Sequence, residues 1–154
     1  MTVAVGKPAP DFTMPTDGGG SVSLKDLKGK KVVLYFYPKD DTPGCTKEAC
    51  GFRDAMPDFS GLDAVIIGVS RDSVAKHDKF KTKCELPFTL ASDEDGKTSE
   101  AYGTWVEKSM YGKKYMGMER ATFLIDEAGV LRNEWRKVKV PGHVEAVLEA
   151  VKAG

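Results

Sequence analysis

The sequence predicts an α/β domain built around a mixed β-sheet, and three observations indicate this class. Val32–Tyr37 and Ala64–Ser70 are continuous apolar runs rich in β-branched or aromatic residues, typical of strands covered on both faces. A helical segment follows each run, so the two β-α units imply a parallel pair with right-handed crossovers. A later hairpin around Asp126–Gly129 adds antiparallel strands. Because 154 residues favour one core, we expect residues 1–154 to form a single domain.

The chain starts with an extended segment and a predicted β-hairpin. Gly6–Asp11 contains two prolines, which disfavour a helix. Phe12–Pro15 and Val22–Leu24 are short strands on either side of Asp17–Gly20, whose composition is typical of a hairpin loop. Asp26–Gly29 then forms a turn that leads into the first central strand.

The first long helix is predicted to begin at Thr42 and Pro43. Threonine is a good N-cap residue, and proline suits the first helical position. Along this helix, steps of four and three residues place one apolar face against the sheet, made of Cys45, Ala49, Phe52, Met56 and Phe59.

The second half of the chain continues the alternation of strands and helices. Asp72–Ser73 is predicted to cap a helix that ends near Cys84, and Thr98–Tyr102 forms a short helix. Ala121–Ile125 and Val130–Trp135 are the strands of the late hairpin. A C-terminal amphipathic helix is predicted from the i, i+3, i+4, i+7 spacing of Val144, Val147, Leu148 and Val151.

Composition limits the classes of partner. Lysine plus arginine number 23 and aspartate plus glutamate also number 23, so the formal net charge is zero. This balance argues against nucleic acid, because phosphate binding needs a cationic surplus or a basic patch. No signal peptide is evident, and no apolar stretch approaches the ~20 residues that span a bilayer. We therefore expect a cytoplasmic protein without a membrane partner, in which three cysteines do not form a disulfide framework.

Cys45 is the candidate reactive group. It occupies the third position of the helix predicted to start after Thr42, where backbone amides are unpaired and the helix dipole is positive. This position favours the thiolate form. The N-cap hydroxyl of Thr42 is expected to point at an amide of the first turn and so to lie close to Cys45. The alternative is a structural cysteine, because Cys45 lies on the apolar face and free cysteines are often buried.

Cys50 strengthens the hypothesis of redox chemistry. Five helical positions separate it from Cys45, which places the two Cα atoms roughly 8.7 Å apart and the side chains about 140° apart. A disulfide needs Cα atoms within ~7 Å. The two cysteines therefore cannot bond while both remain in an intact helix, and bonding requires that the helix unwinds locally.

The remaining ligand-type residues suggest no metal site. Cys84, His77 and His143 do not complete a metal-ligand spacing with the Cys-x4-Cys pair. The pair also differs from Cys-x-x-Cys, which disfavours a simple dithiol oxidoreductase. Cys84 is interpreted as a core thiol. The Met- and Tyr-rich segment Met110–Met118 is interpreted as a loop whose side chains pack in the core or on the surface, with a collar near the site as the alternative.

A thiolate that attacks a peroxide also needs a fixed donor for the departing oxygen, which develops negative charge. Arginine suits this role because it stays charged and offers several donors. Arg120 is favoured because it begins the strand Arg120–Asp126, where a rigid sheet could direct it toward the helix start. The candidates are Arg53, Arg71, Arg120, Arg132 and Arg136.

The segment Tyr35–Cys50 resembles the active-site segment of peroxiredoxins, Pro-x-x-x-Thr-x-x-Cys. Its Cys-x4-Cys arrangement resembles the Q-type, or bacterioferritin-comigratory-protein, subfamily. The resemblance covers nearly the whole chain, with further matches at Gly68–Ser70, Leu90–Asp93, Met110–Lys113 and Arg120–Asp126. It implies a thioredoxin-like α/β fold, in which helices flank a central mixed sheet and a β-hairpin is added at the N-terminus.

The resemblance also implies roles for the two cysteines. Cys45 is the expected peroxidatic cysteine, which attacks hydrogen peroxide or an organic hydroperoxide and becomes a sulfenic acid. Cys50 is the expected resolving cysteine, which forms an intramolecular disulfide with Cys45, and thioredoxin then reduces that disulfide. We expect a thioredoxin-dependent peroxidase that is a monomer and has no cofactor.

Four further residues match the family pattern. Thr42 and Arg120 match positions that bind and polarise the peroxide, Pro38 matches the residue that shields the pocket, and Glu48 matches a position that helps hold the arginine. Two other functions stay open: a peroxide sensor that passes oxidation to a partner protein, and a non-enzymatic binding domain. Slow turnover with a trapped mixed disulfide would favour the sensor, whereas absence of any disulfide on mild oxidation would favour the binding domain.

Overall fold

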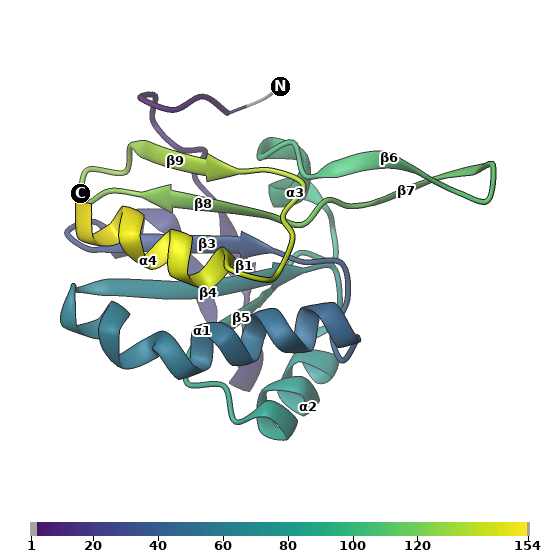
Figure 1. The fold of residues 1–154 in the computed structure, drawn as a ribbon, viewed down its shortest axis with the longest axis horizontal. Helices are drawn as coiled ribbons and strands as arrows, with labels where there is room; N and C mark the ends of the chain where they lie inside the picture. Colours follow the sequence, from purple (N-terminus) through teal and green to yellow (C-terminus); the bar gives the residue numbers. More distant parts are fainter. Residues whose placement is uncertain (1–2, 154) are drawn as a thin grey trace.

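A five-stranded mixed sheet runs through the centre of the molecule (Figure 1). The computed structural model describes residues 3–153. Strands β3 and β4 are parallel, as are β4 and β5, whereas β8 is antiparallel to both β3 and β9. The predicted mixed sheet is therefore confirmed. In the spatial order β5-β4-β3-β8-β9, the strands are Thr89–Ser92, Ala64–Ser70, Lys31–Phe36, Ala121–Ile125 and Leu131–Trp135.

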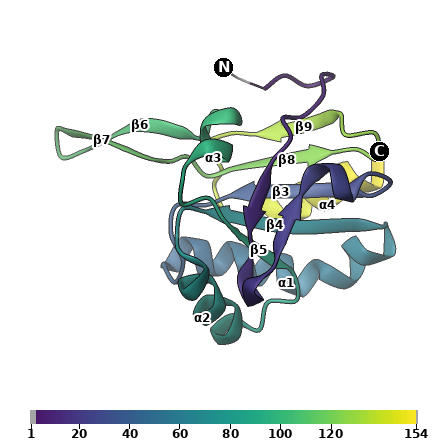
Figure 2. The same ribbon diagram turned by 180° about the vertical axis from the view of Figure 1, so that it is seen from behind.

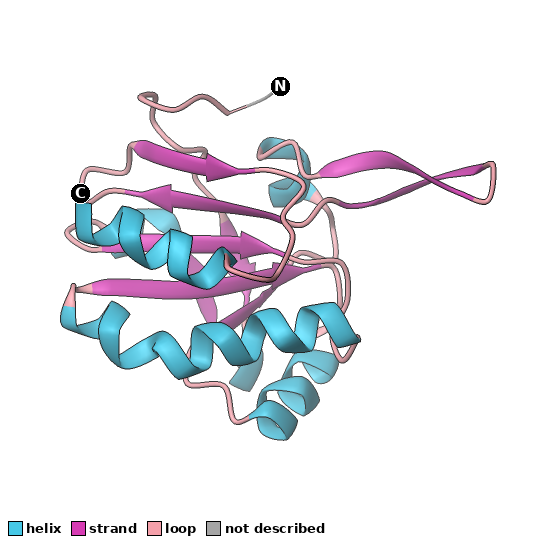
Figure 3. Cartoon of the chain, viewed as in Figure 1, coloured by secondary structure: helices cyan, strands magenta, loops and turns pink. Residues whose placement is uncertain are grey.

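Helices cover one face of this sheet. Helix α1 (Pro43–Gly61) and helix α4 (His143–Ala153) lie side by side in front of it, and α2 (Val74–Cys84) lies beyond β5 (Figures 1 and 3). Alternation along β3 explains the packing, because Val33 and Tyr35 enter the core beneath these helices. The side chains between them point to the opposite face.

The opposite face is covered by the N-terminal hairpin and α3 (Lys97–Ala101), as Figure 2 shows. Strands β1 (Thr13–Pro15) and β2 (Ser21–Ser23) pair as predicted, and a short 3-10 turn, η1 (Asp17–Gly19), connects them. A second 3-10 turn, η2 (Leu24–Leu27), follows β2.

A second hairpin extends away from the sheet (Figures 1 and 2). It consists of β6 (Trp105–Met110) and β7 (Lys113–Met118), so the interpretation of this segment as a loop was wrong. Tyr111 and Gly112 form its tip with φ values of 52° and 79°, which suit a tight two-residue turn. Both hairpin faces are largely exposed, and the apolar-polar alternation that identifies a strand is therefore absent.

Candidate active site

The site lies at the loop that connects β3 to α1. Strand β3 ends at Phe36, and α1 begins at Pro43 with Thr42 as its N-cap residue, so the predicted helix start is confirmed. Cys45 lies in the first turn and is 2% exposed. This burial agrees with the prediction that Cys45 lies on the apolar face of the helix.

The register between β3 and β8 brings Arg120 to this helix start. Ala121 pairs with Phe36, the last residue of β3. Arg120 therefore lies one residue beyond the paired region, next to the end of β3 that leads into α1. Its guanidinium donates from Nη2 to Cys45 Sγ at 3.3 Å. From Nη1 it donates to Glu48 Oε1 at 2.7 Å. One guanidinium therefore connects the thiol to a carboxylate one helical turn further along α1.

The local backbone makes room for this arrangement. A Cβ atom at Gly44 would lie 3.1 Å from Arg120 Nη2, closer than a side-chain carbon ordinarily packs. Glycine at the second helical position therefore lets the guanidinium approach α1 closely. The sequence offered no signal for this requirement, because the contact joins residues far apart in the chain.

Burial controls the charges of the pair. Glu48 is fully buried, and within residues 3–153 its Oε2 atom has no hydrogen-bond partner. Burial raises the pKa of Glu48 to about 7, although the charge and hydrogen bond of Arg120 oppose this rise. Burial lowers the pKa of Arg120, but the Glu48 and Cys45 charges outweigh it and leave that pKa above its ordinary value. Arg120 thus keeps its positive charge beside the sulfur.

Thr42 uses its hydroxyl differently from the expectation. It donates from Oγ1 to the Lys39 carbonyl at 2.9 Å, and among the residues that the structure describes it makes no side-chain cap to α1. The expected hydrogen bond to an amide of the first turn was therefore wrong. The hydroxyl hydrogen goes to a backbone carbonyl three residues earlier in the loop. The oxygen remains an acceptor, since donating one hydrogen leaves its lone pairs.

The loop before α1 is anchored by a buried polar network. His77 Nε2 donates to the Ala91 carbonyl at 2.9 Å, and its Nδ1 lies 2.6 Å from Asp40 Oδ2. Tyr37 donates to the other oxygen of Asp40 at 2.5 Å, and the Asp40 amide donates to Asp72 at 2.7 Å. His77 is fully buried and joins α2 to the loop before α1.

Lys108 is a cation near the site that sequence reasoning missed. It lies half-buried on β6, and its side chain runs over Gly117 on β7, where a Cβ atom would come within 3.1 Å of it. Burial and the charge of Arg120 lower the pKa of Lys108, while Glu119 and Cys45 oppose the shift. Lys108, in the middle of β6, is therefore close enough to the site for its charge to interact with those of Arg120 and Cys45. No local pattern in the sequence identifies this lysine.

Pro38 lies exposed in the loop between β3 and α1, next to Lys39. The other four candidate arginines are engaged elsewhere. Arg71 stacks at 4.0 Å over the ring of Trp105. The remaining three have carboxylate partners, since Arg53 pairs with Asp54, Arg132 with Asp126 and Arg136 with Glu119.

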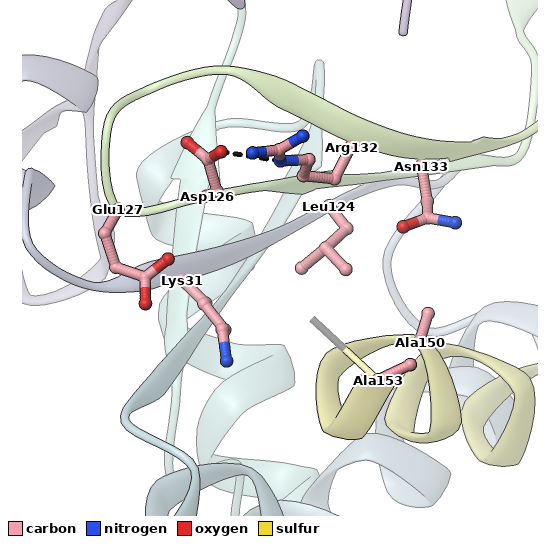
Figure 4. Close-up of a pocket in the computed structure, with 8 residues that line it drawn as sticks. All are labelled: Lys31, Leu124, Asp126, Glu127, Arg132, Asn133, Ala150 and Ala153. Carbon is pink, nitrogen blue, oxygen red and sulfur yellow. Dashed lines mark hydrogen bonds and ion pairs between the residues drawn. The ribbon is translucent and has the colours of Figure 1, made fainter. Parts of the chain in front are cut away.

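A cavity of about 350 Å³ lies at the opposite end of β3 (Figure 4). Lys31, which begins β3, lines it, whereas the cysteines follow the end of that strand. The arginine in the lining of this cavity already has a carboxylate partner, because Arg132 Nε donates to Asp126 at 2.7 Å. This cavity is therefore separate from the Cys45 site. Its lining is Lys31, Leu124, Asp126, Glu127, Arg132, Asn133, Ala150 and Ala153.

Within the described residues, His, Cys, Asp and Glu side chains form no group of three or more that could hold a metal ion. None of the helices in residues 3–153 is long and apolar enough to cross a membrane.

A cysteine at the start of the helix that follows a central strand, held by an arginine from an antiparallel neighbour, defines a thiol enzyme of thioredoxin-like fold. A family model described as the AhpC/TSA family matches residues 5–134. Peroxiredoxin Bcp of Bacillus subtilis is 57% identical over 152 residues, which cover 99% of this chain and 97% of that protein. The chain belongs to the AhpC/TSA family, among its Bcp or Q-type peroxiredoxins.

Solved structures agree with this assignment. The bacterioferritin comigratory protein of Xanthomonas campestris, studied for alkyl peroxide reduction, superposes with a TM-score of 0.92 at 44% identity, covering 97% of this chain and 98% of that chain. A cysteine-to-serine variant of PrxQ from Xylella fastidiosa gives 0.94 at 39% identity, covering 99% and 98%. The expected thioredoxin-like fold with an added N-terminal hairpin is therefore confirmed.

Proposed function

We propose that this enzyme reduces hydrogen peroxide and organic hydroperoxides through Cys45. The observation that carries the proposal is the contact between Cys45 Sγ and Arg120 Nη2 at 3.3 Å. Arg120 stabilises the sulfur as a thiolate and offers donors to the oxygens of a bound peroxide. The alkyl peroxide reduction described for the Xanthomonas campestris relative supports the same substrate class.

The first step is attack by the Cys45 thiolate on one peroxide oxygen. The S–O bond forms as the O–O bond breaks, which gives a Cys45 sulfenic acid and, after one proton is taken up, water or an alcohol. Arg120 stabilises the negative charge that develops on the departing oxygen. The Thr42 oxygen accepts a hydrogen bond from the peroxide, while Pro38 shields the pocket. Glu48 positions Arg120 through the 2.7 Å contact.

The second step joins Cys45 to Cys50 and releases water. Cys45 faces Arg120, whereas Cys50, five residues on in the same helix, packs toward the core beside α2. The intact helix therefore keeps the two sulfurs apart, and its first turns must unwind before the disulfide can form. Amide hydrogen exchange in residues 45–55 should be faster in the oxidised protein, and equal exchange in both redox states would contradict this step.

Thioredoxin is the proposed reductant of the Cys45–Cys50 disulfide. An intramolecular disulfide in one folding unit needs no partner copy, so we infer a single-domain monomer. With zero formal net charge, no membrane-crossing helix in residues 3–153 and no need of a lipid or nucleic acid, a cytoplasmic location fits this reaction.

The test couples peroxide reduction to NADPH oxidation through thioredoxin and thioredoxin reductase. The wild-type protein should sustain turnover, and Cys45→Ser should abolish it. Thr46→Ser, one residue along the same helix, is the matched control and should keep turnover. Full activity in Cys45→Ser would contradict the assignment of the reactive sulfur. Slow turnover together with a mixed disulfide trapped by Cys50→Ser would instead indicate a peroxide sensor.

A further inference from the structure

Cys84 is a buried thiol that the proposed reaction leaves unused. It is the last residue of α2, is 6% exposed, and belongs to the core cluster against which Cys50 packs. Three residues after Cys50, Arg53 donates from Nη1 to the Cys84 carbonyl at 2.8 Å. This face of α1 is therefore turned toward the end of α2, and it brings Cys50 to Cys84.

Cys50 lies close enough to Cys84 to affect the pKa of the Cys84 thiol. Burial raises the pKa of Cys84, and the charge and hydrogen bonding of Cys50 raise it further. Cys45, in contrast, is in contact with Arg120. While α1 is an intact helix, Cys50 is therefore close to Cys84, whereas Cys45 is in contact with Arg120.

We propose that Cys84 takes over the disulfide from Cys45, so that the oxidised protein converts to a Cys50–Cys84 disulfide. This proposal rests on the proposed function, which supplies the Cys45–Cys50 disulfide. The Cys84 thiolate attacks the Cys50 sulfur, the Cys50–Cys84 bond forms, and the Cys45–Cys50 bond breaks. Cys45 leaves as a thiolate and the Cys84 proton goes to solvent. No further oxidant is needed, because one disulfide replaces another.

Re-forming the intact helix α1 favours the Cys50–Cys84 disulfide over the Cys45–Cys50 disulfide. A Cys45–Cys50 disulfide keeps the first turns of α1 unwound, since an intact helix holds the two sulfurs apart. A Cys50–Cys84 disulfide joins Cys50 to a member of the core cluster against which it packs while α1 is an intact helix. The exchange therefore lets the first turns of α1 re-form and returns Cys45 to Arg120, which stabilises it as a leaving thiolate.

The rate of exchange should increase with pH. Only the thiolate attacks a disulfide, and the raised pKa of Cys84 keeps that thiol largely protonated near neutral pH. The direct disulfide should therefore persist long enough to be observed at neutral pH and should disappear faster in alkaline buffer.

The experiment follows disulfide pairing over time in the wild-type protein. Reduced protein receives one equivalent of hydrogen peroxide without any reductant, samples are quenched in acid and alkylated, and a non-reducing peptide map identifies the pairs. Cys45–Cys50 should appear first and then convert to Cys50–Cys84. Persistence of Cys45–Cys50 alone would overturn the proposal, as would a Cys45–Cys84 pair or a disulfide between two chains.

Peroxide stoichiometry provides a second measurement. Because the exchange frees Cys45, the wild-type protein should consume about two equivalents of peroxide without reductant, and Cys84→Ser about one. Cys84→Ala should behave as Cys84→Ser does, which separates the loss of the thiol from the polarity of serine. Equal consumption by all three proteins would contradict the exchange. A failure of the proposed function is distinguishable, because no peroxide would then be consumed and no disulfide would form.

Discussion

Glu48→Gln tests the electrostatic state of the buried carboxyl beside Arg120. Glu48 is fully buried, and its Oε1 accepts from Arg120 Nη1 at 2.7 Å. Glutamine keeps the size of the side chain and an acceptor oxygen, but it cannot ionise. The substitution therefore removes a titration from the core while largely keeping the packing.

The magnitude follows from the pKa of Glu48, which burial raises from 4.5 to about 7. Between these two pH values the folded protein holds a proton that the unfolded chain has released. The free energy of unfolding must then fall as the pH rises. From about pH 5 to about pH 8, the Glu48 contribution to that free energy should fall by about 2 to 3 kcal/mol. The Glu48→Gln protein lacks this loss.

The assay is urea unfolding followed by far-UV circular dichroism in the presence of a reductant, at both pH values. Any difference in stability between variant and wild type that does not depend on pH, such as altered packing around Arg120, cancels when the two pH values are compared. The free energy of unfolding of wild type, measured relative to that of the variant, should therefore fall by about 2 to 3 kcal/mol between the lower and the higher pH. Glu134→Gln, at an exposed position on β9, is the control and should show no such change. A difference that does not depend on pH would refute the reasoning.

Three further predictions concern the same region. Arg120→Lys should slow peroxide reduction about 10²-fold, because lysine lacks the forked donors that reach both Cys45 and Glu48. Arg136→Lys is the control and should have little effect on the rate. Equal rates of peroxide reduction in the Arg120→Lys protein and the wild type would contradict the role of Arg120. Gly44→Ala should slow peroxide reduction without loss of thermal stability, because the added carbon meets Arg120 at 3.1 Å, whereas Gly61→Ala, with open space around it, should leave the rate unchanged. Burial lowers the pKa of His77, but the hydrogen bond and charge of Asp40 outweigh it and raise that pKa. The folded protein therefore holds the His77 proton more tightly than the unfolded chain does. The free energy of unfolding of wild type, relative to that of His77→Gln, should fall as the pH rises through the raised pKa. A relative stability that grows in alkaline buffer would contradict a raised pKa of His77.

Local patterns account for the elements that the sequence predicted correctly. Thr42 and Pro43 specify where α1 begins through cap preference and fixed φ, whatever the rest of the chain does. The apolar runs at β3 and β4 identify buried strands for a similar reason, since covering both faces of a strand demands continuous hydrophobicity. The β6–β7 hairpin escaped prediction because both of its faces meet solvent.

The side-chain contacts of the loop before α1 could not be predicted from sequence. Thr42 donates its hydroxyl hydrogen to the Lys39 carbonyl instead of accepting from a helix amide, and the path of the loop sets this geometry. His77 and Asp40 are 37 residues apart in sequence, and only the packing of α2 against this loop brings their side chains within 2.6 Å. Lys108 interacts with Arg120 only because the β6–β7 hairpin places this part of β6 near the site.

The sequence by itself determined that Cys45 would lie in the first turn of a helix after a central strand, with Cys50 out of its reach in the same helix. Helix geometry and cap preference are local, so a short segment suffices to specify both. The tertiary structure alone decided which groups surround those thiols. The register of β8 against β3 brings Arg120 to Cys45, and the packing of α2 on α1 brings Cys84 to Cys50. Such contacts depend on how distant segments align, and no local pattern records that alignment.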